Sequence, residues 1–177
     1  MSIINRIPEK LINYKVFRDG SDLVGLAEVD LPDIDHLAEN LGGSGLAGEF
    51  ESPTIGHIKN MTLKMKFRTI YKPVVGLVEP KPVLFDLRLS VQAVDAGTSE
   101  YSSYPSRIVV RGTPKKKGLG KLDPGKKMDN EVELAVTYLK IFVDGEETLE
   151  VDQLNFMFKV NGVDVLAQVR EHLGMTN

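Results

Sequence analysis

The residues that could do chemistry begin with a glycine run. Residues 43–48 (GSGLAG) match the GxGxxG pattern. That pattern binds dinucleotides when it follows a strand and opens a helix. Here the next residues are 49–53 (EFESP), which do not continue as a helix because proline breaks it. The run therefore predicts a flexible or extended loop, and we keep a nucleotide-dependent enzyme only as a third interpretation of the chain.

A second glycine pattern, residues 120–126 (GKLDPGK), matches the GxxxxGK signature of phosphate-binding loops. The following residue is Lys127, where coordination of magnesium requires serine or threonine. Pro124 also lacks the backbone N–H that such a loop points at phosphate. No apolar strand leads directly into the pattern, so it predicts no phosphate site.

The histidines and paired carboxylates do not form a reactive group either. His36, His57 and His172 are scattered without metal-ligand spacing, and the chain has no cysteine. Glu131 and Glu133 lie two apart on a predicted strand and so share one face, which is more typical of a solvated or partner-facing strand than of a catalytic pair. We therefore predict no catalytic residue, no cofactor and no metal, and we predict that the protein is not an enzyme.

The bulk composition is that of one globular domain, residues 1–177. Hydrophobic residues make up 42% of the chain and charged residues 27%, which is enough for an apolar core. The net charge of −3 gives no general case for binding nucleic acid or anionic membranes. No segment reaches the ~18 apolar residues that span a bilayer, so we expect no membrane anchor. The lack of cysteine fits folding in a reducing cytoplasm.

Period-two alternation predicts that most elements are strands. In residues 61–67 the apolar side chains of Met61, Leu63, Met65 and Phe67 share one face. Residues 83–95 alternate in the same way, and shorter patterns predict strands over 12–18, 23–31, 106–111, 131–143 and 148–160. The first two of these would form a hairpin through Asp19-Gly20. Within 131–143 the apolar positions change phase, which indicates a bulge or burial on both faces.

Helical signals are few. Residues 33–41 could form a short helix ending at Gly42, and a C-terminal helix would begin after Asn161 and pack Val163, Leu166 and Val169 on the sheet. Residues 71–82 contain three prolines and are predicted to be a connection. The predicted fold is mainly β: an antiparallel β-sandwich or partly closed barrel with one or two short helices.

Two segments have little reason to pack within the domain. One is an extended arm, residues 41–56, rich in glycine. The other is a basic loop, residues 112–130, rich in glycine, proline and lysine. The loop is either a solvated mobile segment or a docking element for an acidic surface; nucleic-acid binding is disfavoured because stacking aromatic residues are missing from it. The acidic segment 129–152 beside this loop would suit head-to-tail contacts between identical copies.

These segments, in this order, resemble a known family. The residues that carry the resemblance are GGSGLAGEFESPTIGHIKNMTLKMKFRT (42–69), VLFDLRLSVQ (83–92), IVVRGTPKKKGLGKLDPGKK (108–127) and LEVDQLNFMFKVNGVDVLAQVREHLG (149–174). Over nearly the full chain they are similar to the major tail tube protein of contractile-tailed bacteriophages and related phage-tail-like bacteriocins. The resemblance implies a structural subunit of the inner tube that self-assembles into stacked hexameric rings. The tube would be a conduit for DNA ejection or for puncturing an envelope.

The same resemblance implies partners and a location. The partners would be other copies of the chain, the sheath protein, baseplate and tail terminator proteins, a tape measure protein in the lumen, and DNA in transit if the particle is a phage. The protein would lie in the virion tail, or in a tail-like bacteriocin particle, after synthesis in the cytoplasm of a bacterial host. The alternative from a different class is a monomeric β-sandwich binding module with a flexible basic loop.

Within this interpretation we expect interface elements in place of a catalytic site. The inter-subunit arm would use Gly42, Gly43, Gly45, Gly48 and Phe50. A polar strand face, toward the lumen or a neighbour, would present Thr62, Lys64, Lys66 and Arg68. The basic docking loop would use Lys115, Lys116, Lys117, Lys121, Lys126 and Lys127. A lumen that passes DNA should not bind it tightly, so the candidate acidic lining is Glu131, Glu133 and Asp144.

Overall fold

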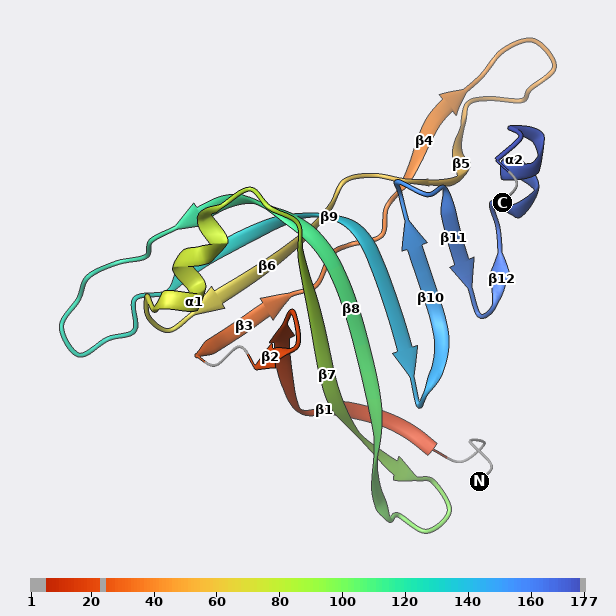
Figure 1. Cartoon of the computed structure of the whole chain (residues 1–177). Helices are drawn as coiled ribbons and strands as arrows, with labels where there is room; N and C mark the ends of the chain where they lie inside the picture. The colour runs from red at the N-terminus through yellow and green to blue at the C-terminus, as the bar shows by residue number, and fades with distance from the viewer. Residues whose placement is uncertain (1–5, 23–24, 176–177) are drawn as a thin grey trace.

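The computed structural model of the chain describes residues 6–22 and 25–175. Strands joined by turns make up most of it, with short helical segments at two places (Figure 1). In chain order the elements are β1 (Arg6–Arg18), β2 (Ser21–Asp22), β3 (Leu26–Asp30), β4 (His36–Leu41), β5 (Phe50–Ile58), β6 (Met61–Phe67), α1 (Lys72–Val75), the 3-10 turn η2 (Gly76–Val78), β7 (Val83–Asp95), β8 (Tyr101–Gly118), β9 (Asn130–Val143), β10 (Glu146–Asp152), β11 (Met157–Val160), β12 (Val163–Asp164) and α2 (Ala167–His172).

One large sheet organises the molecule, and all its neighbouring strands are antiparallel. Its order is β12-β11-β10-β9-β8-β7-β1-β2. The long strand β9 has two partners on its second side: β6 beside residues 130–136 and β10 beside residues 138–143. β3 then pairs with β6, so the sheet curls round one end into a partly closed barrel (Figure 1). The predicted fold class, mainly β and antiparallel with few short helices, is confirmed.

The alternating strands bury the residues that the sequence predicts. Met61, Leu63, Met65 and Phe67 are all at most 1% exposed, and β7 has the predicted bounds with Phe85 fully buried. Opposite them, β9 contributes Val132 and Leu134 to the same core. The short α1–η2 segment adds Val74 and Leu77. At about 25 cal/mol per Å² of apolar surface, this core is the main source of stability of the fold.

A bulge explains the phase change within β9. Arg111 of β8 lies opposite Tyr138, whereas the next residue, Gly112, lies opposite Val136, so Thr137 has no partner in the ladder. The extra residue returns Leu139 to the buried face that Val136 occupies. The predicted bulge is therefore present. It keeps one continuous core face, and one continuous polar face on the other side of the sheet.

One expectation about local structure is wrong, and two others are incomplete. Residues 33–41 do not form a helix, since His36–Leu41 is strand β4. A helix of that length is marginal in water, and pairing with β5 satisfies the same backbone groups. The predicted connection 71–82 contains α1, which has a proline in its first turn, where the missing N–H costs nothing. The predicted strand 106–111 is only the middle of the much longer β8.

The C-terminal part also differs from the prediction. Residues 148–160 are two strands, β10 and β11, because Asp152 Oδ1 accepts hydrogen bonds from the N–H groups of Leu154 and Asn155, 3.1 Å each, and stabilises a turn. The predicted C-terminal helix is only α2, which begins at Ala167. Val163, expected on its buried stripe, lies in β12 and is 67% exposed.

The N-terminal hairpin is partly confirmed. Asp19 and Gly20 have φ values of 47° and 84°, as a tight hairpin turn requires, and they join β1 to β2. The predicted second strand, residues 23–31, begins at residues 23–24, which lie outside the described residues. Its remainder, β3, pairs with β6 instead of β1.

One ion pair holds α2 onto the sheet, and its removal is a test of this corner. Arg170 hydrogen-bonds Asp164 through both Nη atoms and donates to Phe156 O at 2.9 Å. The hydrogen bond from Arg170 lowers the pKa of Asp164, and the N–H of Leu166 lowers it further. A lowered folded-state pKa means that this stabilisation is present above about pH 4 and is lost as pH falls through the folded pKa.

We therefore expect Asp164→Asn to speed backbone amide exchange in α2 at pH 7, with the difference from the parent protein fading below about pH 4. Hydrogen exchange followed by mass spectrometry measures this. Equal protection of α2 in both proteins at pH 7 would show that the pair does not hold the helix. Glu171→Gln, in the same helix, is the control because no ion pair of Glu171 is present in the described part of the chain.

Candidate assembly surfaces

The glycine-rich segment lies at the end of a projecting two-stranded ribbon, residues 36–58 (Figure 1). β4 and β5 pair only with each other, with Leu41 opposite Phe50. Gly45 at the tip has a φ of 96°, a left-handed conformation that favours glycine. The predicted arm residues Gly42, Gly43, Gly45, Gly48 and Phe50 all lie at the exposed end of this ribbon. Two strands alone are marginally stable in water, so the ribbon needs support.

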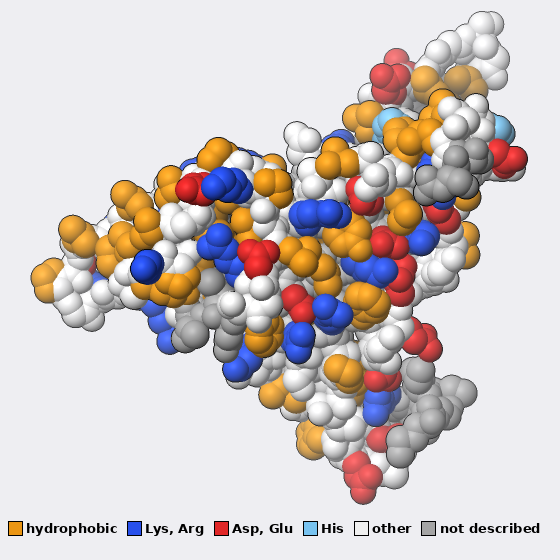
Figure 2. Space-filling model, viewed as in Figure 1, with side chains coloured by type: hydrophobic (Ala, Val, Ile, Leu, Met, Phe, Trp, Pro, Cys, Tyr) orange, Lys and Arg blue, Asp and Glu red, His pale blue; other side chains and the backbone are white. Residues whose placement is uncertain are grey.

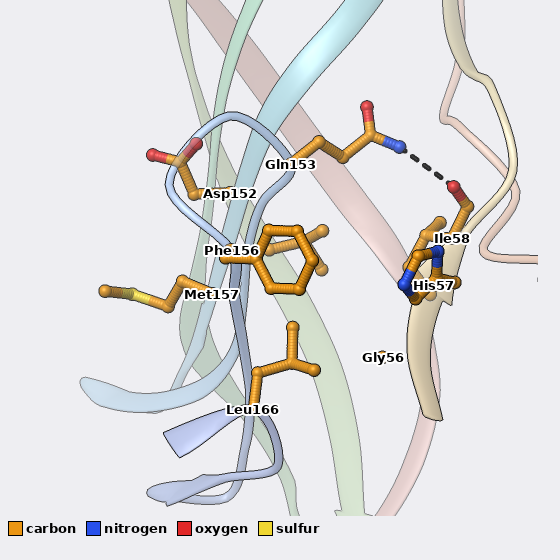
Figure 3. A pocket seen from close by; sticks show the side chains of 9 residues that line it. Gly56, His57, Ile58, Asp152, Gln153, Phe156, Met157 and Leu166 are labelled. Carbon is orange, nitrogen blue, oxygen red and sulfur yellow. Dashed lines mark hydrogen bonds between the residues drawn. The ribbon is translucent and has the colours of Figure 1, made fainter. Parts of the chain in front are cut away.

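Support comes from the base of the ribbon (Figure 3). Gln153 Nε2 donates hydrogen bonds to Ile58 O at 3.1 Å and Lys59 O at 3.3 Å. The ring of His57 lies edge-on to Phe156, with 5.9 Å between the ring centroids. A pocket of about 160 Å³ lies between these groups. The contacts tie the ribbon to the turn between β10 and β11.

Gly56 makes the closest approach at this base. Its φ is 68°, and a Cβ placed on it would lie 2.3 Å from Leu166 Cδ2. Leu166 is 3% exposed and belongs to the main core. The backbone of β5 therefore packs directly on a core side chain from the C-terminal segment. This contact could not be predicted from the sequence, because nothing near Gly56 signals a residue more than a hundred positions away.

The predicted polar strand face exists, and its charges alternate in sign. Lys66 pairs with Glu28 at 3.1 Å and lies opposite Glu131 on β9. Lys64 lies opposite Asp30 on β3 and Glu133 on β9. Thr62 belongs to the same face, whereas Arg68 lies just beyond the end of β6.

The lysines at positions 115–117 do not belong to a loop, so the predicted boundary of the basic loop is wrong. β8 continues to Gly118 because its backbone pairs with β9. Lys115 donates to Thr62 Oγ1 at 2.7 Å, and Lys116 pairs with Glu133 at 2.8 Å. Lys117 crosses the ring of Phe67 to donate to Val74 O at 2.9 Å, and burial lowers its pKa. These three side chains are held within the subunit.

The β8–β9 loop, residues 119–129, is what is left of the predicted basic loop. It contains Lys121, Lys126 and Lys127, of which Lys126 pairs with Asp123 at 2.7 Å and Lys127 with Asp129 at 3.6 Å. These ion pairs are highly exposed and so contribute little stability. Leu122 in the same loop is 88% exposed. The loop projects from the end of the molecule opposite the ribbon (Figure 1).

The three acids of the candidate lumen lining lie at two separate places in the fold. Glu131 and Glu133 lie together on the polar face, where lysines separate them from other acids. The hydrogen bond from Lys116 lowers the pKa of Glu133, so this carboxylate is charged at neutral pH. Asp144 lies at the far end of β9, in the turn to β10, and pairs with Arg6 at 3.6 Å. The three acids thus do not form one acidic patch.

A second part of the polar face was not found from the sequence. Glu150 accepts from Tyr138 at 2.9 Å and pairs with Lys140 and Lys159, each at 3.4 Å. Burial raises the pKa of Glu150, but the hydrogen bond from Tyr138 and the two lysines outweigh it, so the pKa is lowered. Figure 2 shows basic and acidic side chains interspersed over the face where β7 to β10 lie.

The outer edge of β1 is open. β2 pairs with Phe17 and Arg18, and within the described chain residues 6–14 have a ladder partner on one side only, β7. Ile7, Leu11 and Ile12 on this edge strand are 51%, 46% and 54% exposed. An exposed apolar edge strand is a template for pairing with another chain.

Over the described residues, no cluster of three or more histidine, cysteine, aspartate or glutamate residues has an arrangement that could hold a metal. Within the same residues, no helix is long and apolar enough to cross a membrane. What the described surface does offer is an open sheet edge, a rigidly based ribbon and a projecting loop. These are features of a β protein that contacts other proteins in an assembly.

Comparison with known proteins identifies the family. The sequence profile of the family described as phage tail tube protein FII matches residues 8–174. The tail tube protein of Escherichia phage P2 is 28% identical over 180 residues, covering 96% of this chain and 99% of that protein. The chain therefore belongs to the phage tail tube protein FII family and is a tail tube subunit.

Solved structures share the fold at low sequence identity. A chain of the sheath/tube terminator of an extracellular contractile injection system, PVC, in the extended state has a TM-score of 0.54, with 13% identity, over 77% of this chain and 97% of that chain. A chain of the PVC sheath-tube complex in the extended state has a TM-score of 0.53, with 11% identity, over 73% and 88%.

Proposed function

We propose that this chain, acting as one domain, is the repeating subunit of the inner tube of a contractile particle, where it forms hexameric rings that stack into a hollow conduit. The open edge of β1 carries the proposal. Along residues 6–14 the described chain pairs only with β7, and Ile7, Leu11 and Ile12 are exposed, so pairing with a neighbouring subunit would cover this part of the strand. Joining sheets around a ring removes the free edges and makes one barrel.

The polar face suits the wall of such a conduit. Its acids and bases alternate, as in Glu28–Lys66–Glu131, so it presents little net charge. A wall with little net charge does not hold the phosphate backbone of DNA, because tight binding requires many unbalanced lysines and arginines. We propose that this face, including Glu131 and Glu133, lines the lumen, through which DNA passes in a phage and within which a tape measure protein would lie during assembly.

The other partners follow from the same role. A sheath protein would surround the tube, a baseplate would nucleate it and a terminator would close it. The particle would be a virion tail or a tail-like bacteriocin, with the subunit made in the bacterial cytoplasm. This role is structural: the subunit assembles into the tube and catalyses no reaction.

Negative-stain electron microscopy of the purified protein over a concentration series tests the proposal. We expect rings or hollow tubes of uniform width above a threshold concentration, or on addition of the cognate baseplate, which supplies a nucleus. Monomers at every concentration, with baseplate present, would contradict the proposal and support a monomeric binding module instead.

A further inference from the structure

We propose that the ribbon, residues 36–58, is a preset docking surface for the β8–β9 loop, residues 119–129, of a second copy of this chain. This proposal rests on the proposed function: the partner of the ribbon is the β8–β9 loop of a neighbouring subunit, and the reverse holds for the loop. It joins two projecting features whose outer ends are exposed in the described chain.

The ribbon presents apolar and acidic groups together. Leu41 and Phe50 form a cross-strand pair at its end and are 44% and 50% exposed. Glu39, Glu49 and Glu51 lie beside them, and none has an ion-pair partner in the described chain. Residues 36–58 contain these three acids and neither lysine nor arginine, which gives a formal charge of −3 with neutral histidines.

The β8–β9 loop is the complement of this surface. Leu119 and Leu122 are 62% and 88% exposed. The loop has the three lysines Lys121, Lys126 and Lys127 against the two acids Asp123 and Asp129, hence a formal charge of +1. Lys121 has no ion-pair partner among the described residues, and the pairs of the other two lysines are exposed and readily exchanged. Apolar contact with a complementary charged rim is the usual composition of a specific interface.

The ribbon and the β8–β9 loop can meet only if they belong to two different copies of the chain. Ribbon and loop project from opposite ends of the molecule (Figure 1), and Figure 2 shows hydrophobic side chains at both ends. Two different patches at opposite ends make a head-to-tail contact, and repetition of that contact gives a closed ring or an extending filament. The base of the ribbon, fixed by Gln153 and Leu166, holds the docking surface in place before the partner arrives.

Reversal of charge on each side tests the pairing. The ribbon variant Glu39→Lys/Glu51→Lys and the loop variant Lys121→Glu/Lys126→Glu are each expected to form no tubes at concentrations where the parent protein assembles. A chain carrying all four changes is expected to assemble again, because the attraction is restored with opposite sign. Tubes of normal number from either single-side variant would overturn the inference. No tubes from any protein, including the parent with baseplate, would instead count against the proposed function.

Cross-linking provides an independent readout if the four-change chain misfolds. The chain has no cysteine, so introduced thiols are the only ones present. Phe50→Cys and Leu122→Cys variants, mixed, assembled and mildly oxidised, are expected to form a disulfide-linked dimer with one chain of each kind. Tyr101→Cys is the matched control, because Tyr101 is 71% exposed but is the first residue of β8, outside both the ribbon and the β8–β9 loop. Equal yields with Tyr101→Cys and Phe50→Cys, or no linked dimer in assembled tubes, would overturn the docking.

Discussion

Replacing Phe67 with alanine is expected to lower the free energy of unfolding by about 3–5 kcal/mol. Phe67 is fully buried at the end of β6, and its ring lies edge-on to Tyr71 with 6.3 Å between centroids. Lys117 Nζ lies 5.8 Å from the same ring on its way to Val74 O. Removal of the ring leaves a cavity in the core. It also removes the aromatic contact of the partly buried Lys117 ammonium, and both changes destabilise the folded state.

Urea unfolding of the protein below its assembly threshold measures this loss. Leu122→Ala is the control, since Leu122 is 88% exposed and its truncation should change stability by no more than about 0.5 kcal/mol. A loss of less than about 1 kcal/mol for Phe67→Ala would show that β6 does not pack as described.

Replacing Gly56 with valine is expected to abolish tube formation while the barrel stays folded. A β-branched residue at a φ of 68° is strained by at least about 1–2 kcal/mol. Its Cβ would also lie 2.3 Å from Leu166 Cδ2, so either the ribbon swings away or Leu166 leaves the core. The first response displaces the docking surface, and the second loosens the C-terminal segment that supports it.

Electron microscopy of the variant, with circular dichroism to confirm the fold, measures this outcome. Gly162→Val is a matched control, because Gly162 has a φ of 81° but nothing within 4 Å of its Cβ position. It carries the backbone strain without the clash, and we expect it to assemble. Tubes of normal number and width from Gly56→Val would show that the packing of Gly56 on Leu166 does not set the direction of the ribbon.

Much of the buried face could be predicted from the sequence. In a strand, residues two apart share a face, so the alternation from Met61 to Phe67 is enough to identify the core side of β6. The bulge in β9 was likewise visible as a change of phase. The helix predicted over 33–41 failed because its local signals are weak, and pairing with β5, whose first residue lies beyond the glycine tip, stabilises a strand instead.

The roles of the lysines show where local patterns stop being informative. Lys115, Lys116 and Lys117 follow a glycine and a proline, which predicts a loop, yet β9 pairs with this stretch and places the side chains beside Thr62, Glu133 and Val74. Those partners come from other strands, and only the register of the sheet selects them. The loop itself therefore contains only three lysines, all of which follow Gly118.

By itself, the sequence determined the class of fold, the buried faces of the main strands and, through its resemblance to a family, the tail tube role. Each of these depends on residues close together in the chain or on an overall order of segments. Only the tertiary structure decided which charges are paired within the subunit, which sheet edge is open and that Gly56 lies against Leu166. Such contacts join residues far apart in the chain, and the register and curl of the whole sheet decide them.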